Sequence, residues 1–136
     1  MFIDGGAYDG DTIEEIDMWT KGRFKHIYCF EPQKDKIESI EKKLYRWGDR
    51  VTLFKKGLWS DERVISFEDG TDTMSGHVSE NGIKKVETTF LDKVISEKVS
   101  FIKMDIEGAE KEAGTASASE QRISSGRFCD MCLSTL

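Results

Sequence analysis

The first twelve residues contain the feature that most constrains the fold: a short apolar strand runs into an acid, a glycine-rich turn and a helix. Asp4 ends the strand, and Gly6 and Gly10 lie in the turn. Glycine adopts backbone angles that other residues avoid and lets the main chain approach a ligand closely. A second apolar run ends at Phe30, directly before Glu31, and an acid at such a strand end can hold two ribose hydroxyls. The pattern predicts a site for a nucleoside-bearing cofactor.

Apolar periodicity divides the rest of the chain into strands and helices. Residues spaced three to four apart predict amphipathic helices at 12–20, with Asp11 or Thr12 as its cap, and at 34–47. Weak periodicity predicts a loop at 68–82. Short, mostly apolar runs predict strands that are buried on both faces, as in parallel sheets. The expected strands are Phe2–Ile3, His26–Phe30, Val51–Phe54, Gly57–Ser60, Val64–Phe67, Val86–Phe90 and Val99–Asp105.

Strands that alternate with helices predict an α/β domain with a mostly parallel sheet, whose ligands bind at the carboxyl ends of the strands. Three acids, Asp4, Glu31 and Asp105, each fall at the end of a different expected strand. Glu107–Glu110 then opens another helix. We therefore expect the three carboxylates to lie together at one edge of the sheet, around one ligand.

Four segments resemble, in order and spacing, the FkbM family of S-adenosylmethionine-dependent methyltransferases. They are Asp4–Gly10, Phe30–Pro32, Gly57–Asp61 and Lys103–Glu110. The last, with its Asp-x-Glu-Gly-Ala-Glu block after an apolar strand, is the most specific, and the resemblance extends to residue 113. It implies an α/β, Rossmann-like class I methyltransferase fold, a mostly parallel sheet with flanking helices that lacks its last strands.

The resemblance also implies which residues bind S-adenosyl-L-methionine. Three parts of that donor need contacts: the methionine end, the ribose and the adenine. The methionine end would contact Asp4, Gly6 and Gly10, and the ribose would contact Glu31. The adenine would contact Leu58 and Trp59. Ala7 completes the donor-binding set.

Asp105 and Glu107 would be the catalytic residues that face the transferred methyl and the acceptor. The family commonly methylates hydroxyl groups of sugars or secondary metabolites, so the implied partner is a small hydroxylated molecule. Methyl transfer depends mainly on positioning, but a hydroxyl acceptor also needs a base. Either acid is a candidate if burial or mutual repulsion raises its pKa, and His77 is the other titratable candidate.

Composition excludes several other classes. The chain has 136 residues and a formal charge of −6, with acids and bases interleaved. That length predicts one domain, and the charge argues against a nucleic-acid partner. No apolar run is long enough to span a membrane and no leader is evident, so we expect a cytoplasmic protein with no membrane partner. Cys129 and Cys132 lack the second pair or histidine of a metal site, and we expect no metal.

Two alternative functions stay open. A nicotinamide-dependent oxidoreductase also uses a glycine turn and a later acid, but its fingerprint is Gly-x-Gly-x-x-Gly, whereas here an acid precedes Gly6-x-x-x-Gly10. A non-catalytic remnant could hold a nucleoside without turning it over. The sequence does not indicate the oligomeric state.

The resemblance stops after Ala113. We expect 1–113 to be a partial S-adenosylmethionine-binding domain and 114–136 to be an aberrant tail, in a C-terminally truncated or frame-shifted copy. Back-translating 128–133 and reading one nucleotide later gives Phe or Ser, Ala or Val, Ile or Thr, Cys, then Ala or Val. One choice is Phe-Ala-Ile-Cys-Val, an apolar run typical of a strand. The strand ending at Asp105 would lack its next neighbour. We therefore expect marginal stability and weak activity.

Overall fold

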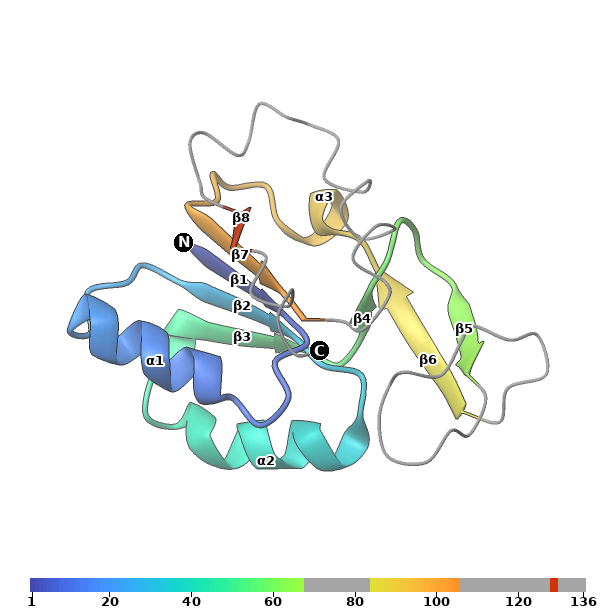
Figure 1. Ribbon diagram of the computed structural model, residues 1–136, viewed down its shortest axis with the longest axis horizontal. Helices are drawn as coiled ribbons and strands as arrows, with labels where there is room; N and C mark the ends of the chain where they lie inside the picture. The colour runs from blue at the N-terminus through green and yellow to red at the C-terminus, as the bar shows by residue number, and fades with distance from the viewer. Residues whose placement is uncertain (68–83, 106–127, 130–136) are drawn as a thin grey trace, which may run out of the picture.

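The computed structural model describes residues 1–67, 84–105 and 128–129 (Figure 1). Within these ranges the main sheet has the order β3-β2-β1-β7-β8, and every neighbouring pair in it is parallel. Its strands are β1 (Phe2–Gly5), β2 (Ile27–Phe30), β3 (Val51–Phe54), β7 (Phe101–Met104) and β8 (Phe128–Cys129). The predicted α/β fold with a mostly parallel sheet is confirmed.

Two helices, α1 (Asp11–Thr20) and α2 (Lys34–Leu44), cover one face of this sheet (Figure 1). Their apolar stripes are the ones that the sequence periodicity predicts, because Ile13, Ile16 and Ile40 are almost fully buried. Burying such side chains stabilises the fold by about 1.5–3 kcal/mol each. The buried cluster on this face comprises Ala7, Ile13, Ile16, Phe24, Ile27, Cys29, Ile40, Trp47 and Val51.

A second apolar cluster lies on the opposite face, under β4 (Gly57–Leu58) and α3 (Leu91–Val94). Side chains alternate between the two faces along each strand, so Ile3 and Ile102 contribute here while their strand neighbours face the helices. The buried members are Met1, Ile3, Phe30, Leu58, Leu91, Ile95, Val99, Ile102 and Met104. The sheet is therefore a central layer between two apolar layers.

A small second sheet has the order β4-β6-β5 and extends to one side of the molecule (Figure 1). β6 (Lys84–Thr89) pairs parallel with β4 and antiparallel with β5 (Val64–Phe67). β4 connects the two sheets, because its Leu58 is packed into the core beside the main sheet. The predicted loop at 68–82 lies outside the described residues.

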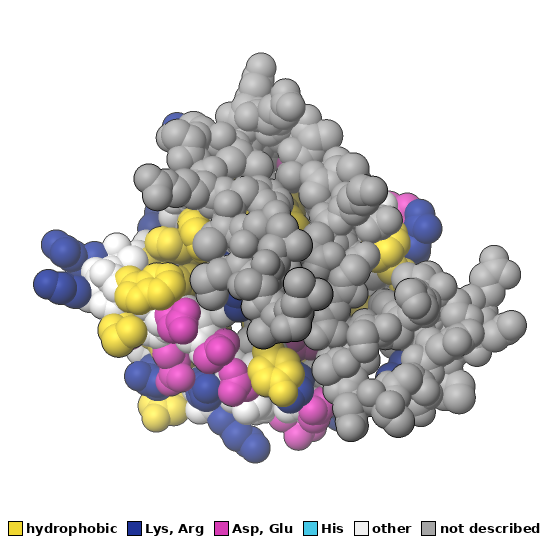
Figure 2. All heavy atoms as spheres, in the orientation of Figure 1, with side chains coloured by type: hydrophobic (Ala, Val, Ile, Leu, Met, Phe, Trp, Pro, Cys, Tyr) yellow, Lys and Arg dark blue, Asp and Glu magenta, His cyan; other side chains and the backbone are white. Residues whose placement is uncertain are grey.

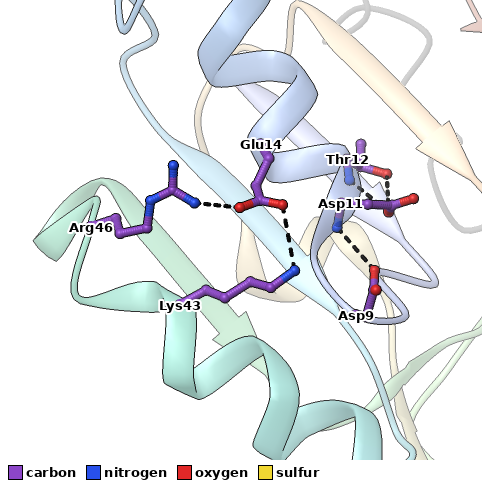
Figure 3. A network of polar contacts seen from close by, with 6 residues as sticks. All are labelled: Asp9, Asp11, Thr12, Glu14, Lys43 and Arg46. Carbon is purple, nitrogen blue, oxygen red and sulfur yellow. Dashed lines mark hydrogen bonds and ion pairs between the residues drawn. The ribbon is translucent and has the colours of Figure 1, made fainter.

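Two helix predictions were wrong. The N-cap of α1 is Gly10 in a left-handed conformation, with no side-chain cap; Asp11 instead accepts a bond from the amide of Thr12 (Figure 3). The second helix ends at Leu44 rather than residue 47, and a 3-10 turn, Gly48–Arg50, follows. In addition, the sequence analysis did not anticipate α3, which is only one turn long and has no clear periodicity.

Glu14 links α1 to α2 near the surface, where it forms ion pairs with Lys43, at 3.5 Å, and with Arg46 (Figure 3). All three side chains are between 30% and 46% exposed. Exposed ion pairs of this kind each contribute about 0–1 kcal/mol. The packing of the two helices therefore depends on the apolar cluster beneath them.

The outer edge of β7 differs from what we expected. β8 pairs with it in parallel register, joining Ile102 to Phe128 and Lys103 to Cys129. The strand before Asp105 therefore does have a neighbour along these two residues. The remainder of the 114–136 segment, including Cys132, lies outside the described residues, as does the expected helix at 107–110.

The packing of the two sheets can be tested at the close contact between Gly5 and Leu58. A Cβ placed on Gly5 would lie 2.8 Å from Cδ1 of the buried Leu58. We expect Gly5→Ala to destabilise the protein by about 1–3 kcal/mol because that atom must move. The cost should be smaller in a Leu58→Val background, which lacks the δ carbons. Urea denaturation of the four proteins measures both; an equal cost in both backgrounds would contradict the contact.

Candidate functional site

The carboxyl end of β1 is the point where the strand order reverses, since β2 and β3 lie on one side of it and β7 on the other. In open α/β sheets, ligands bind in the crevice at such a point. Gly5 pairs with Phe30 of β2 and with Met104 of β7, and the amide of Asp105 donates to the carbonyl of Gly5 over 2.8 Å. The acids that end or follow these strands are therefore brought to one edge.

The glycine turn between β1 and α1 is hydrogen-bonded to a single carbonyl group of β2. The oxygen of Phe30 accepts hydrogen bonds from the amides of Gly6, at 2.9 Å, and Ala7, at 3.1 Å. The amide of Gly10 then bonds back to the carbonyl of Ala7 at 2.8 Å. Gly6 and Gly10 have φ values of 80° and 84°, a region in which other residues are strained. These angles are the reason the turn needs glycine at both positions.

The side chain of Glu31 also forms a hydrogen bond with this turn. Its carboxylate accepts one bond from the amide of Tyr8, at 2.9 Å, and one from the amide of Gln33, at 2.8 Å. Burial raises the pKa of Glu31, and these two amide bonds partly oppose the increase. Each carboxylate oxygen still has a further lone pair. Glu31 can therefore accept additional hydrogen bonds, such as those of ribose hydroxyls.

Asp4 is the most unusual residue of the edge. Its side chain is 0% exposed, and neither carboxylate oxygen has a hydrogen-bond partner among the described residues. Burial raises the pKa of Asp4 to about 7, although the nearby charge of Lys103 opposes the increase. Buried polar groups normally have partners, so an unpartnered carboxylate at a ligand-binding edge is a strong indication of a site.

Lys103 and Thr12 belong to this edge but were missed as site residues. The ammonium of Lys103 donates to the hydroxyl of Thr12 at 2.6 Å and lies 3.9 Å from Oδ1 of Asp4. The sequence predicts Lys103 only as a partly buried side chain that snorkels or pairs with an acid, and the structure confirms this with Asp4 as the acid. The signal that would have found it is strand register, since Lys103 and Asp4 are direct partners on β7 and β1.

The remaining donor-binding candidates lie close to the turn in different ways. Ala7 is fully buried in the helix-facing core, and its amide and carbonyl bond to Phe30 and Gly10. Leu58 is also buried, directly against Gly5. Trp59 follows it, is partly buried and donates its amide to the carbonyl of Thr89. Leu58 therefore borders the end of β1 from the second sheet, and Trp59 is the residue that follows it.

Tyr8 is a further residue of this edge that was not predicted as a site residue from the sequence. It is 55% exposed at the tip of the turn and has a φ of 50°, unusual for a residue with a side chain. The ammonium of Lys36, at the start of α2, lies 3.5 Å from the centroid of its ring. Such a cation–π contact contributes about 0.5–1 kcal/mol at an exposed site. It covers the outer side of the turn.

The predicted catalytic pair is described only in part. Asp105 is partly buried, and its charge contributes to the raised pKa of Asp4. Glu107 and the alternative base His77 lie outside the described residues. Within the described ranges, no cluster of His, Cys, Asp and Glu could hold a metal ion. In the same part of the chain, no helix has the length and apolar character needed to cross a bilayer.

Acidic side chains gather on the face of the molecule that carries α1 and α2, interspersed with lysines and arginines (Figure 2). Asp9 and Asp11 lie there at the start of α1, where the amide of Asp11 donates to Asp9 at 3.2 Å (Figure 3). Asp9 and Asp11 therefore place two carboxyl groups at the start of α1, which favours a cationic ligand.

A glycine turn held at the carboxyl edge of a parallel sheet, with an acid after the second strand, is the arrangement by which doubly wound α/β proteins bind nucleosides. The profile of the methyltransferase FkbM domain matches residues 4–113. The chain belongs to this family. That membership supports methyl transfer as the reaction class and does not support the nicotinamide alternative.

A solved structure shows the same fold. The crystal structure of methyltransferase FkbM from Methylobacillus flagellatus KT superposes with a TM-score of 0.68 at 23% sequence identity. The match covers 85% of this chain but 28% of that one. The chain therefore spans less than a third of the length of that methyltransferase. Among curated proteins, no match was found.

The burial of Asp4 predicts a specific dependence of stability on pH. The folded-state pKa of about 7 exceeds the ordinary 3.8, so the folded chain binds more protons between these values. Stability should therefore decrease as the pH rises from about 4 to about 7, by at most about 4 kcal/mol. Asp4→Asn should remove this decrease, because the amide does not titrate.

Urea denaturation across this pH range measures the effect. The matched control is Asp49→Asn, at an exposed aspartate in the 3-10 turn, which should keep the wild-type profile. If Asp4→Asn and wild type lose stability in parallel, Asp4 does not titrate as described.

Proposed function

We propose that this chain binds S-adenosyl-L-methionine at the turn between β1 and α1 and takes part in methyl transfer to a hydroxyl group of a small molecule, such as a sugar or secondary metabolite. The observation that carries the proposal is the buried carboxylate of Asp4, which has no hydrogen-bond partner among the described residues and lies beside a glycine turn and Glu31 in a member of the FkbM family. The whole activity is a proposal because the chain spans only part of the matched methyltransferase.

The residues present fit this donor. Its ammonium and sulfonium are cationic, and Asp4 offers an anion with no hydrogen-bond partner among the described residues. The free lone pairs of Glu31 suit the two ribose hydroxyls. Leu58 and Trp59 offer apolar surface for the adenine from the adjoining sheet. Gly6 and Gly10 have no side chain, so the turn can adopt their positive φ angles, and the backbone at Gly6 can approach a ligand closely.

The donor supplies a methyl carbon activated by a sulfonium. The acceptor oxygen forms the new bond to that carbon as the carbon–sulfur bond breaks, and the electron pair of that bond stays on sulfur, giving a neutral thioether. The hydroxyl proton then needs a base, for which Asp105 and Glu107 are the candidates. The main contribution of the chain is alignment, because oriented reactants lower the barrier by about 7–11 kcal/mol.

A donor-binding chain without turnover is the second candidate. It is motivated by the coverage of the match, which reaches only 28% of that longer protein and so identifies no acceptor site in this chain. Methyl transfer to a mixture of hydroxylated compounds, followed by release of the demethylated donor, distinguishes the two candidates.

Calorimetric titration with S-adenosylmethionine tests donor binding. We expect a single site whose affinity falls about tenfold or more in Glu31→Gln, because a hydrogen bond to a charged group contributes about 1.5–3 kcal/mol. Glu15→Gln, at an exposed position of α1, is the matched control and should bind as wild type does. Absence of binding to the wild-type chain, or tighter binding of NAD, would refute the proposal.

The interpretation of 114–136 as an aberrant tail stays a proposal. It is supported by the end of the family match at residue 113. The nucleotide sequence of the gene tests it: we expect a reading frame one nucleotide later, after Ala113, to encode further family-like strands. If that frame encodes none, the reading-frame hypothesis is wrong.

A further inference from the structure

We propose that Lys103 is a positioning residue of the donor site: its ammonium joins Asp4 on β1 to Thr12 in the first turn of α1, and so holds both ends of the glycine turn in place. The part of this inference that concerns donor binding rests on the proposed function. The part that concerns Asp4 itself does not.

Strand pairing brings Lys103 to this place. It is the direct partner of Asp4 in the parallel register of β7 and β1, and paired residues of neighbouring strands point to the same face of a sheet. That face carries α1, whose Thr12 is buried. The ammonium therefore lies between a strand and the helix that follows it, 2.6 Å from the hydroxyl of Thr12 and 3.9 Å from Oδ1 of Asp4.

The two contacts differ in kind. The bond to Thr12 is short and direct, so it fixes the position of the ammonium. The distance to Asp4 is too long for a hydrogen bond but close enough for a strong Coulomb interaction, because the side chain of Lys103 is only 21% exposed and that of Asp4 is 0% exposed. Lys103 therefore stabilises the ionised form of Asp4 without occupying a hydrogen-bonding position on its oxygens.

The hydroxyl of Thr12 also favours the ionised form of Asp4, whereas the other groups that face Asp4 act against its ionisation. Burial is the largest effect, and the charges of Asp11, on α1, and Asp105, after β7, add to it. On β2, the neighbouring Cys29 is a neutral thiol, since burial and the charge of Asp4 raise its pKa well above the usual range. Among these groups, Lys103 is the cation that favours the carboxylate. Without it, Asp4 would remain protonated at a higher pH.

A protonated Asp4 would bind a cationic donor poorly. Removal of the ammonium should therefore weaken donor binding near neutral pH, and binding should recover at higher pH, where Asp4 ionises. A variant that had simply lost its structure would not recover binding at higher pH. Removal of the Thr12 hydroxyl should raise the pKa of Asp4 by less than removal of the ammonium does, because both charges remain, and it also removes the contact between Lys103 and α1.

The experiment uses the full chain and titrates S-adenosylmethionine by calorimetry from about pH 6 to about pH 9. For Lys103→Met we expect about tenfold weaker binding at neutral pH and a midpoint of the pH dependence about one unit higher. Lys103→Arg, which keeps the charge, should bind within about threefold of wild type. Lys98→Met, at an exposed lysine shortly before β7, is the matched control and should match wild type. Equal affinity and an equal midpoint in Lys103→Met would overturn the inference.

A second measurement needs no donor. Carbon-13 NMR of the Asp4 carboxyl follows its titration in the free protein, where Lys103→Met should raise the midpoint and Thr12→Val should raise it by less, because the charge of Lys103 has the larger effect on this pKa, while weakening donor binding. An unchanged midpoint in Lys103→Met overturns the inference even if the donor binds. A raised midpoint with no donor binding to wild type supports the role of Lys103 and refutes only the proposed function.

If Lys103→Met does not fold, as judged by circular dichroism, Lys103→Arg and Thr12→Val decide the matter. Donor affinity in Thr12→Val equal to that of wild type would then overturn the inference.

Discussion

The carbonyl of Phe30 is the point on which the geometry of the site depends. It accepts the amides of both Gly6 and Ala7 at the end of β2, so the glycine turn leaves β1 in a direction that the neighbouring strand determines. Glu31, the next residue, adds a bond to the amide of Tyr8. The candidate donor site is therefore made by two strands together, and its shape requires β1 and β2 to be paired in their observed register.

A buried carboxylate is costly, and the chain keeps one where the sheet order reverses. Among the described residues, none forms a hydrogen bond with the oxygens of Asp4. The nearby ammonium of Lys103 offsets only part of the increase in pKa that burial causes. Natural proteins accept local costs of this kind at functional sites and offset them elsewhere. Here the offset comes from the two apolar clusters, one on each face of the sheet.

Much of the fold could be predicted because its signals are local. The strand Val51–Phe54 and the stripes of α1 and α2 follow directly from apolar spacing. The errors also have physical causes. Gly10 caps α1 through a left-handed backbone angle rather than through a side chain. The helix ends at Leu44 although Trp47 continues the apolar spacing. Trp47 is buried while it lies in the turn after the helix, so its burial does not require the helix to continue.

The sequence by itself determined that Asp4, Glu31 and Asp105 meet at one edge, since parallel strands bring their carboxyl ends together whatever their order. Only the tertiary structure decided what each side chain does there. It showed that Glu31 binds the turn, that Leu58 packs against Gly5, and that Lys103 faces Asp4. These contacts join residues far apart in the chain, and they depend on strand order and register, which apolar periodicity does not encode.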